Sequence, residues 1–279
     1  MKKVNLACGS VYIKQSDWIN LDYQPMGDGV IKSDLLGTLR FKQGSVSLVY
    51  SSHFLEHIPR SKVAHFLSEC FRVLEPGGTI RLVLPDLEEI CSQYLYNRQR
   101  SDHKKADFCV VEMIDQCVRL ESGGELGSLY KLYSQSYDRD LEMVEYIRSF
   151  NGELLCKAEN HNNSPLSKIA SLLEEPKLLW GKIAYHLEQY YIRMIVSLLP
   201  KAFRTQNVSL ATVGERHHWL WDFRQIQQAL ESVGFIATSR CSFNTSMFPD
   251  FPFQSLDMDA NGFPRKGLES MYVEAKKPK

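Results

Sequence analysis

The sequence lacks an excess of charge of either sign. Its 279 residues carry 33 Lys and Arg against 33 Asp and Glu, so the formal net charge is zero. Proteins that bind nucleic acid usually present basic surfaces, because contacts to phosphate dominate their affinity. We therefore expect no nucleic acid among the partners of this chain.

Cysteine pairs are missing as well. The seven cysteines are an odd number, and none of them stands in a C-x-x-C pair. Structural zinc sites usually draw on such pairs, so we expect no metal ligands in this chain. Scattered thiols without a pairing pattern favour a reduced compartment. The cysteines are Cys8, Cys70, Cys91, Cys109, Cys117, Cys156 and Cys241.

Segments for membrane insertion or export are also absent. Met1-Lys2-Lys3 leads directly into a strand pattern without a secretory hydrophobic region, and no apolar run reaches the ~20 residues that span a bilayer. Repeats and low-complexity tracts are missing too. The sequence therefore predicts a cytoplasmic protein without a transmembrane segment, built as one large domain or one domain with an insert.

Short apolar runs are present near the start of the chain, and each ends in small or polar residues. Runs of this kind are typical of parallel strands that are buried on both faces. Ligands of open α/β sheets lie beyond the carboxyl ends of such strands. We therefore expect Gly9, Asp22, Asp34 and the pair Ser52-His53 to line one crevice. The runs are Val4–Ser10, Trp18–Leu21, Val30–Ser33 and Ser47–Ser51.

The chemistry of this crevice points to a nucleoside. Gly9 has no Cβ and lets the backbone approach a ligand closely. Asp22 ends the second run, where a carboxylate can accept both hydroxyls of a ribose. Asp34 could accept from an exocyclic amine. The alternative is that Gly9 forms only a turn and that the two aspartates only cap strand ends.

The ordered set of motifs resembles the Rossmann-like (class I) S-adenosylmethionine-dependent methyltransferases, and in particular the methyltransferase domain of type 11. The resemblance is close over residues 3–93 and looser over 215–276. The matching motifs are the glycine turn Leu6-Ala7-Cys8-Gly9-Ser10, the strand-end Asp22, the segment Leu55-Glu56-His57 and the turn Arg72-Val73-Leu74-Glu75-Pro76-Gly77-Gly78 before a fifth strand, Thr79–Leu84.

The resemblance implies a cofactor and the residues that bind it. The cofactor would be S-adenosyl-L-methionine, held along the carboxyl ends of the first four strands. The residues that the resemblance assigns to cofactor binding are Leu6, Ala7, Cys8, Gly9, Ser10, Asp22, Asp34, Leu35, Ser52 and His53.

Two features depart from the family pattern. Ala7 stands where the family usually has glycine, and a further glycine after Gly9 is missing. In addition, only about ten residues separate the first two strands, whereas a crossover with a helix needs a dozen or more. We therefore expect the first helix to be reduced to a turn, as in a branch of the family with the same short link.

The remainder of the chain divides into three parts by pattern. Residues 1–96 and 213–279 carry strand patterns and are predicted to form the two halves of the methyltransferase core. Residues 97–212 carry only helical patterns and are predicted to form a helical insert or lid. The predicted fold class is α/β, a mostly parallel Rossmann-like sheet whose last strand, Ser270–Ala275, inserts antiparallel between the fifth and the sixth, Phe235–Thr238.

Helix boundaries can be predicted for several segments. Ser61 is expected to cap a helix that ends before Pro76-Gly77-Gly78, and Asp222 to cap one that ends at Gly234. In the insert, helices are expected over Asp107–Leu120, Leu141–Phe150 and Leu178–Leu199, with another beginning at Pro165 after the polar loop 151–164.

The helix expected over 178–199 is rich in aromatic and aliphatic side chains. We interpret it as a helix buried inside the insert. The open alternative is a helix on a membrane surface or in a dimer contact, although Lys182 and Arg193 do not make a strongly basic face.

Histidines are the candidates for a general base, since an acceptor hydroxyl must lose its proton during methyl transfer. His53 directly follows the fourth strand, where the acceptor meets the methyl group in this family. His57 lies one turn later and is equally suited to packing or capping. His217 and His218 precede the segment Trp219-Leu220-Trp221. The predicted catalytic residues are His53, His57 and His218.

These observations lead to a functional hypothesis with two alternatives. The hypothesis is an S-adenosylmethionine-dependent O-methyltransferase that acts on a small molecule or a glycan intermediate, by association with polysaccharide assembly. The first alternative is an inactive methyltransferase-like binding scaffold, favoured by Ala7. The second is an NAD-dependent dehydrogenase, which would need a G-x-G-x-x-G turn that opens a helix.

Overall fold

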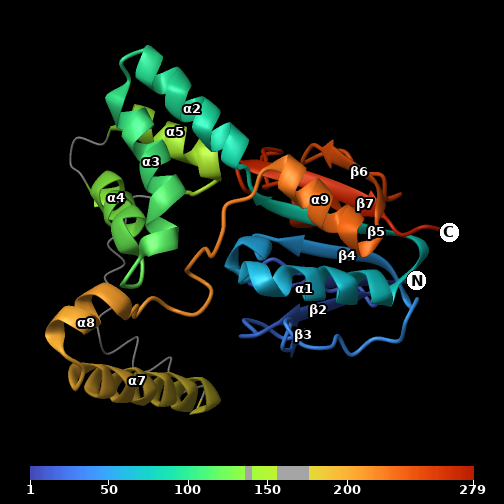
Figure 1. Cartoon of the computed structure of the whole chain (residues 1–279), viewed down its shortest axis with the longest axis horizontal. Coiled ribbons are helices and arrows are strands. Elements are labelled where there is room, and N and C mark those ends of the chain that lie inside the picture. Colours follow the sequence, from blue (N-terminus) through green and yellow to red (C-terminus); the bar gives the residue numbers. More distant parts are fainter. Residues whose placement is uncertain (136–139, 156–175) are drawn as a thin grey trace.

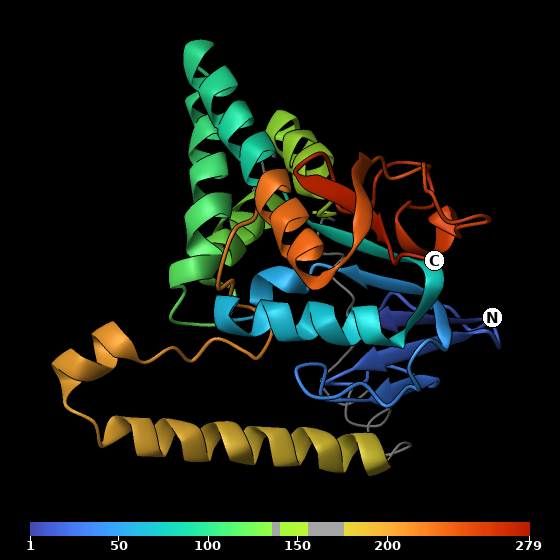
Figure 2. The same ribbon diagram turned by 45° about the vertical axis from the view of Figure 1, so that its right-hand side comes forward.

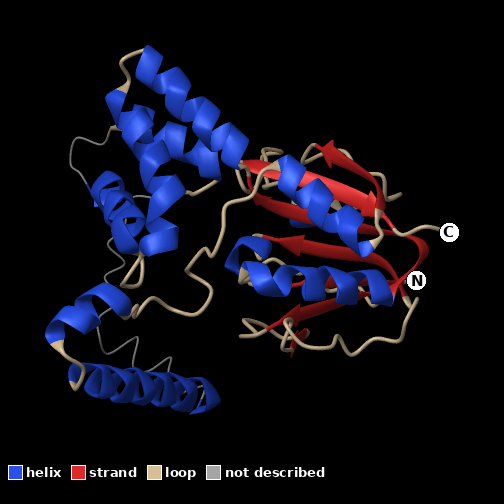
Figure 3. Ribbon diagram, in the orientation of Figure 1, coloured by secondary structure: helices blue, strands red, loops and turns tan. Residues whose placement is uncertain are grey.

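A seven-stranded sheet forms the centre of the protein (Figure 1; Figure 3). The computed structural model describes the backbone of residues 1–135, 140–155 and 176–279, and the side chains of these ranges except 176–185. The strand order is β3-β2-β1-β4-β5-β7-β6, and β7 is antiparallel to both of its neighbours while the other pairs are parallel. This confirms the predicted fold class. The strands are β1 Lys2–Leu6, β2 Trp18–Asp22, β3 Val30–Lys32, β4 Val46–Ser52, β5 Leu74–Pro85, β6 Ile236–Cys241 and β7 Ser270–Lys276.

The register of the parallel strands brings their carboxyl ends to one edge of the sheet. Leu6 at the end of β1 pairs with Leu21 of β2 on one side and with Ser51 of β4 on the other. Asp22 at the end of β2 pairs with Lys32 of β3. The link between β1 and β2 contains no helix, as its length predicted. All four strand ends therefore reach the same side of the molecule.

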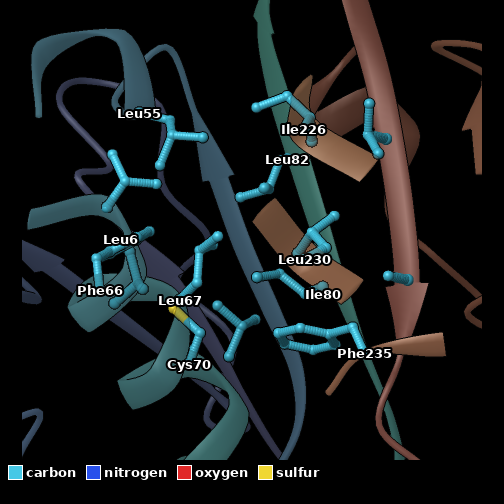
Figure 4. Packing of buried hydrophobic residues seen from close by; sticks show 14 of the residues in the cluster. Leu6, Leu55, Phe66, Leu67, Cys70, Ile80, Leu82, Ile226, Leu230 and Phe235 are labelled. Carbon is cyan, nitrogen blue, oxygen red and sulfur yellow. The ribbon is translucent and has the colours of Figure 1, made fainter. Parts of the chain in front are cut away.

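Two helices cover one face of the sheet, namely α1 Arg60–Val73 and α9 Phe223–Val233. They lie next to each other, α1 in contact with β5 and α9 with β6 and β7, and their apolar stripes meet the strands in the main hydrophobic core (Figure 1; Figure 4). Each stripe follows the helical period, so one face of each helix is buried. The residues labelled in the core are Leu6, Leu55, Phe66, Leu67, Cys70, Ile80, Leu82, Ile226, Leu230 and Phe235.

Helix caps account for the ends of α9, whereas one predicted cap is wrong. Asp222 accepts a hydrogen bond from Gln225 N at 2.8 Å, and Gly234 adopts a left-handed conformation with φ of 108°, as predicted. For α1 the structure differs, because the helix begins at Arg60 and Pro59 takes the cap position. The ring of Pro59 restricts its φ and ends the preceding loop, so Ser61 already lies in the first helical turn.

Alternate residues of the central strands face the other side of the sheet, as the two-residue period of a strand requires. There Tyr50 of β4 and Tyr272 of β7 pack against Phe251 in a second hydrophobic cluster. The chain between β6 and β7, which includes the short α10 Phe253–Leu256, forms this cover. Arg81 of β5 is fully buried on this side, paired with Asp257 and Glu274.

Helices α2 to α5 form a separate group with its own hydrophobic cluster. The group stands beyond the carboxyl end of β5, beside the sheet rather than on either of its faces (Figure 1). Ile90 of α2 belongs to this cluster, so the helical group begins before residue 97 in its packing. The limits of the three predicted parts stay a prediction. The helices are α2 Leu87–Gln99, α3 His103–Val118, α4 Gly124–Gln135 and α5 Leu141–Asn151.

The long helix of the insert differs from its predicted environment. α7 Pro176–Ser197 and α8 Lys201–Asn207 lie apart from the other helices in two views (Figure 1; Figure 2). Tyr190 is 71% exposed and Leu198 is 80% exposed, so burial inside the insert is wrong for the described half of this helix. The periodicity predicted the helix correctly, but an apolar stripe does not indicate which surface, if any, packs against it. Membrane contact or a dimer contact stays a prediction.

Two further expectations concern the insert and the membrane. The helix predicted to begin at Pro165 lies outside the described residues, as does most of the loop 151–164. Among the described helices, none is both long and apolar enough to cross a bilayer.

Candidate active site

The turn after β1 is tied to the end of β2. Gly9 adopts a left-handed conformation with φ of 52°, and its N–H donates to Asp22 Oδ2 at 2.9 Å. Asp22 Oδ1 accepts from Gln24 N at 2.8 Å, and Asp34 Oδ1 accepts from Leu36 N at 3.0 Å. Both aspartates therefore do cap turns, as the alternative interpretation held. A carboxylate has about four acceptor positions, so each keeps acceptor capacity for a ligand.

A cavity of about 440 Å³ lies at this edge of the sheet. It is lined by five of the ten residues predicted to bind the cofactor, which come from the ends of β1, β2 and β4 and from the chain after β3. A ligand-sized pocket is typically 300–1,000 Å³, so this volume suits a nucleoside-sized molecule. The five predicted residues are Ala7, Asp22, Asp34, Leu35 and His53.

A second cavity of about 210 Å³ adjoins the first. Ala7 and His53 line both cavities, and Lys266 contributes a cationic side chain to the smaller one. The predicted residues that line only the smaller cavity are Cys8, Gly9, Ser10 and Ser52. Leu6 lines neither, because its side chain is fully buried in the main core.

His53 occupies the position between the two cavities. Its backbone is left-handed with φ of 49°, a conformation that is uncommon for a residue with a side chain. His53 Nε2 lies 2.9 Å from Ser270 Oγ, and Nδ1 lies 3.4 Å from Glu56 Oε1. The ring is therefore held from β7 on one side and from the helical turn η1 Leu55–His57 on the other.

Glu56 is buried completely behind His53. Neither oxygen of its carboxyl group makes a hydrogen bond within the described part of the chain. Its backbone oxygen accepts from His218 N at 2.7 Å. This bond connects residues 213–219, which we call the returning segment, to η1.

The two remaining predicted histidines have different surroundings. His57 lines the larger cavity, and its Nδ1 lies 2.8 Å from the backbone oxygen of Arg216. The side chain of His218 is exposed and lines neither cavity, so the geometry gives it no place beside the strand ends. Its neighbour His217 is buried instead and packs edge-on against His57, with ring centroids 4.7 Å apart.

Burial controls the charge of these groups. It raises the pKa of Glu56 from 4.5 to about 8. It holds the pKa of His53 well below 6.5, with smaller effects of Lys266, His217 and His57 in the same direction. Burial also lowers the pKa of His57, and it lowers that of His217 to about 3. His53, His57 and His217 are therefore neutral near pH 7, and His53 has a lone pair that can take a proton.

Several residues of the site escaped the sequence analysis. Ser270 and Lys266 reach it from the end of the chain, and Val213 and Gly214 line the larger cavity from the returning segment. No local pattern marks them, because Ser270 and Lys266 reach the site through the insertion of β7 beside β5, and Val213 and Gly214 reach it where the chain returns from the helical part. Tyr23 follows Asp22 directly and could have been named from its position.

Comparison with known proteins gives a family match for part of the chain. Residues 16–82 match the model of a methyltransferase domain family. The match confirms the predicted resemblance for this segment, which includes Asp22, Asp34 and the turn from His53 to His57. The glycine turn at Leu6 to Ser10 precedes the matched segment. No curated protein matches this chain significantly.

Solved structures similar to this chain include several methyltransferases. An S-adenosylmethionine-dependent methyltransferase from Mesorhizobium loti is 23% identical over 30% of this chain, with a TM-score of 0.23. The match spans 47% of that protein, about half its length. One from Archaeoglobus fulgidus is 10% identical over 99% of this chain and 86% of its own, with a TM-score of 0.38. Phosphoethanolamine N-methyltransferase 1 from Haemonchus contortus is 18% identical, and the match covers 32% of this chain and 23% of that protein, with a TM-score of 0.26.

Proposed function

We propose that this chain is an S-adenosylmethionine-dependent methyltransferase whose cofactor binds in the larger cavity. One observation carries the proposal, namely that Asp22, Asp34 and His53 line the same cavity at the carboxyl edge of the sheet. The family match over residues 16–82 supports it. A dehydrogenase is disfavoured, because the chain has no helix between β1 and β2 to meet a pyrophosphate.

The residues of the cavity fit the groups of this cofactor. Asp22 can accept from ribose hydroxyls, and Asp34 can accept from an exocyclic amine through Oδ2, which makes no turn hydrogen bond. Gly9 has open space where a Cβ would stand, so the turn after β1 leaves room for a ligand. The sulfonium of S-adenosylmethionine supplies an electrophilic methyl carbon when the cofactor is bound.

We propose that His53 receives the proton of an acceptor hydroxyl. The Ser270 hydroxyl donates its proton to the backbone oxygen of Lys266 at 3.1 Å, so we assign the ring proton of His53 to Nε2, which donates to Ser270 Oγ. The lone pair is then on Nδ1, which lies 3.4 Å from Glu56 Oε1. A proton taken at Nδ1 makes the ring cationic, and Glu56 Oε1 and Ser270 Oγ then lie beside its two N–H groups. Holding the acceptor and the base in this orientation can contribute about 7–11 kcal/mol to lowering the barrier.

The acceptor that we propose is a hydroxyl of a small molecule or a glycan intermediate in polysaccharide assembly, met in the cytoplasm. A neutral histidine beside the methyl-transfer position supports an oxygen acceptor, since an oxygen must be deprotonated. Val213 and Gly214 line the cavity where the helical part returns to the core. This placement supports a role of the helical part as a lid over the acceptor.

Isothermal titration tests the cofactor assignment. The wild type should bind S-adenosylhomocysteine, and absence of heat with either form of the cofactor would reject the proposed function. Asp22→Ala should weaken binding about 10- to 100-fold, because a hydrogen bond to a charged group contributes about 1.5–3 kcal/mol. Asp28→Ala is the matched control, since Asp28 is exposed in the following loop and lines no described cavity.

Two further results, one from this titration and one from a turnover assay, would separate the remaining alternatives. Equal affinity of the wild type and Asp22→Ala would remove Asp22 from the site. Cofactor binding without formation of S-adenosylhomocysteine from S-adenosylmethionine, across a panel of hydroxylated acceptors, would favour the binding scaffold instead.

A further inference from the structure

Three side chains with metal-binding donors meet beneath His53. They are Glu56 and His57 of η1 and His217 of the returning segment, and one donor atom from each lies within 4.8 Å of the others. Two histidines and one carboxylate are a donor set found in catalytic zinc sites and in non-haem iron sites. The sequence predicted no metal, because its cysteines form no C-x-x-C pair.

Two of these side chains are buried without a hydrogen-bond partner in the described residues. Glu56 is 0% exposed and both of its carboxyl oxygens are unsatisfied, and His217 is 5% exposed with an unsatisfied Nδ1. Such groups are rare, because each costs about 1–3 kcal/mol when it is left without a partner. A cation bound between them would supply a partner to one donor atom of each side chain.

The tautomer of His57 suits a ligand. Its Nδ1 lies 2.8 Å from the backbone oxygen of Arg216, and a carbonyl oxygen can only accept, so Nδ1 carries the proton. The lone pair is therefore on Nε2, which faces Glu56 Oε1 at 3.9 Å. A backbone carbonyl that holds the second nitrogen of a ligating histidine is the usual outer partner in metal sites.

The spacing of the donors allows an ion to bind after small movements. For three atoms no more than 4.8 Å apart, some point lies within about 2.8 Å of all three. Zinc bonds to nitrogen and to carboxylate oxygen are about 2.0–2.2 Å long. Each donor then needs to move inward by less than about 1 Å.

We propose that Glu56, His57 and His217 bind one late first-row divalent cation of the zinc type. The ion would join η1, which follows β4, to the returning segment, in which Val213 and Gly214 line the larger cavity. It would add a side-chain link to the backbone bonds from His218 N and Trp219 N to Glu56 O. This site does not depend on the methyl-transfer proposal, because it is defined by the donors alone.

Metal content and affinity of the full chain test the proposal. The protein is stripped with a chelator and titrated with Zn²⁺, with Co²⁺ as the spectroscopic probe and Mg²⁺ as the contrast. We expect one Zn²⁺ per chain, a visible Co²⁺ ligand-field band that Zn²⁺ abolishes, and no competition by Mg²⁺, since imidazole donors suit zinc and cobalt better than magnesium. Failure of the wild type to bind Zn²⁺, or a Co²⁺ spectrum of a fully hydrated ion, would overturn it.

Neighbouring histidines provide the matched variants. His217→Ala should weaken Zn²⁺ binding at least about 10-fold, whereas His218→Ala should leave it unchanged, because His218 is exposed. Glu56→Gln keeps the shape of the side chain and should also weaken Zn²⁺ binding. This variant tests the site even if His217→Ala does not fold. Equal Zn²⁺ affinity in the wild type, His217→Ala and Glu56→Gln would show that the ion binds elsewhere and would overturn the proposal.

Discussion

His53→Ala should turn over about 10²- to 10⁴-fold more slowly than the wild type, the range that a positioned general base contributes. The reason is geometric, because among the described histidines only His53 lines both cavities. Its ring is held between Ser270 and Glu56, so its removal leaves no group of the described site that can take the hydroxyl proton at the same place. Formation of S-adenosylhomocysteine with an acceptor found by screening hydroxylated glycans and small molecules measures the effect.

A second substitution separates chemistry from backbone strain. His53 has a φ of 49°, which asparagine tolerates better than alanine does. His53→Asn should therefore lose turnover as His53→Ala does while it keeps the affinity for S-adenosylhomocysteine. His65→Ala on the exposed side of α1 is the control and should be as active as the wild type. Full activity of His53→Asn would place the base elsewhere in the molecule.

Arg81→Met should destabilise the protein by about 3–5 kcal/mol, because it leaves buried carboxylates without their counterion. Arg81 is completely buried and lies 2.8 Å from Asp257 and 2.7 Å from Glu274. Asp257 also accepts from Tyr50 OH at 2.7 Å. The network thus ties β4, β5 and β7 to the segment that follows α10, and urea unfolding followed by circular dichroism measures its loss.

Charge rather than volume should cause this loss. Adding Asp257→Asn and Glu274→Gln to Arg81→Met should recover part of the stability, since replacing a whole buried ionic group is often neutral. Arg98→Met is the control, because its partner Asp107 is 66% exposed and the midpoint of unfolding should stay nearly the same. A midpoint for Arg81→Met equal to that of the wild type would show that the network contributes nothing.

Some of the site could be predicted because it depends on short, local patterns. Asp22 and Asp34 each follow an apolar run, and parallel strands place their carboxyl ends at one edge, so their meeting in one cavity could be expected. The shortness of the link before Trp18 excluded a helix in the same way. Leu6 shows the limit of such reasoning, because the end of a strand can point into the core as well as toward the ligand.

Other parts of the site depend on which distant segments meet. His217 and His218 are adjacent and identical in type, and the direction of the chain against η1 decides which one is buried. The family resemblance predicted that the last strand inserts beside the fifth, but no pattern near residue 270 reveals the register that brings Ser270 to His53. The apolar face of α7 was expected to be covered, yet its described half is exposed.

Hydrophobic periodicity and the length of the link between β1 and β2 therefore determined the succession of strands along the chain, the missing first helix and the acidic strand ends. These features follow from interactions among neighbouring residues. Contacts between residues far apart in the chain determined the cluster of Glu56, His57 and His217, the support of His53 and the burial of Arg81. A buried polar group acquires its function from the groups around it, and folding alone brings those groups together.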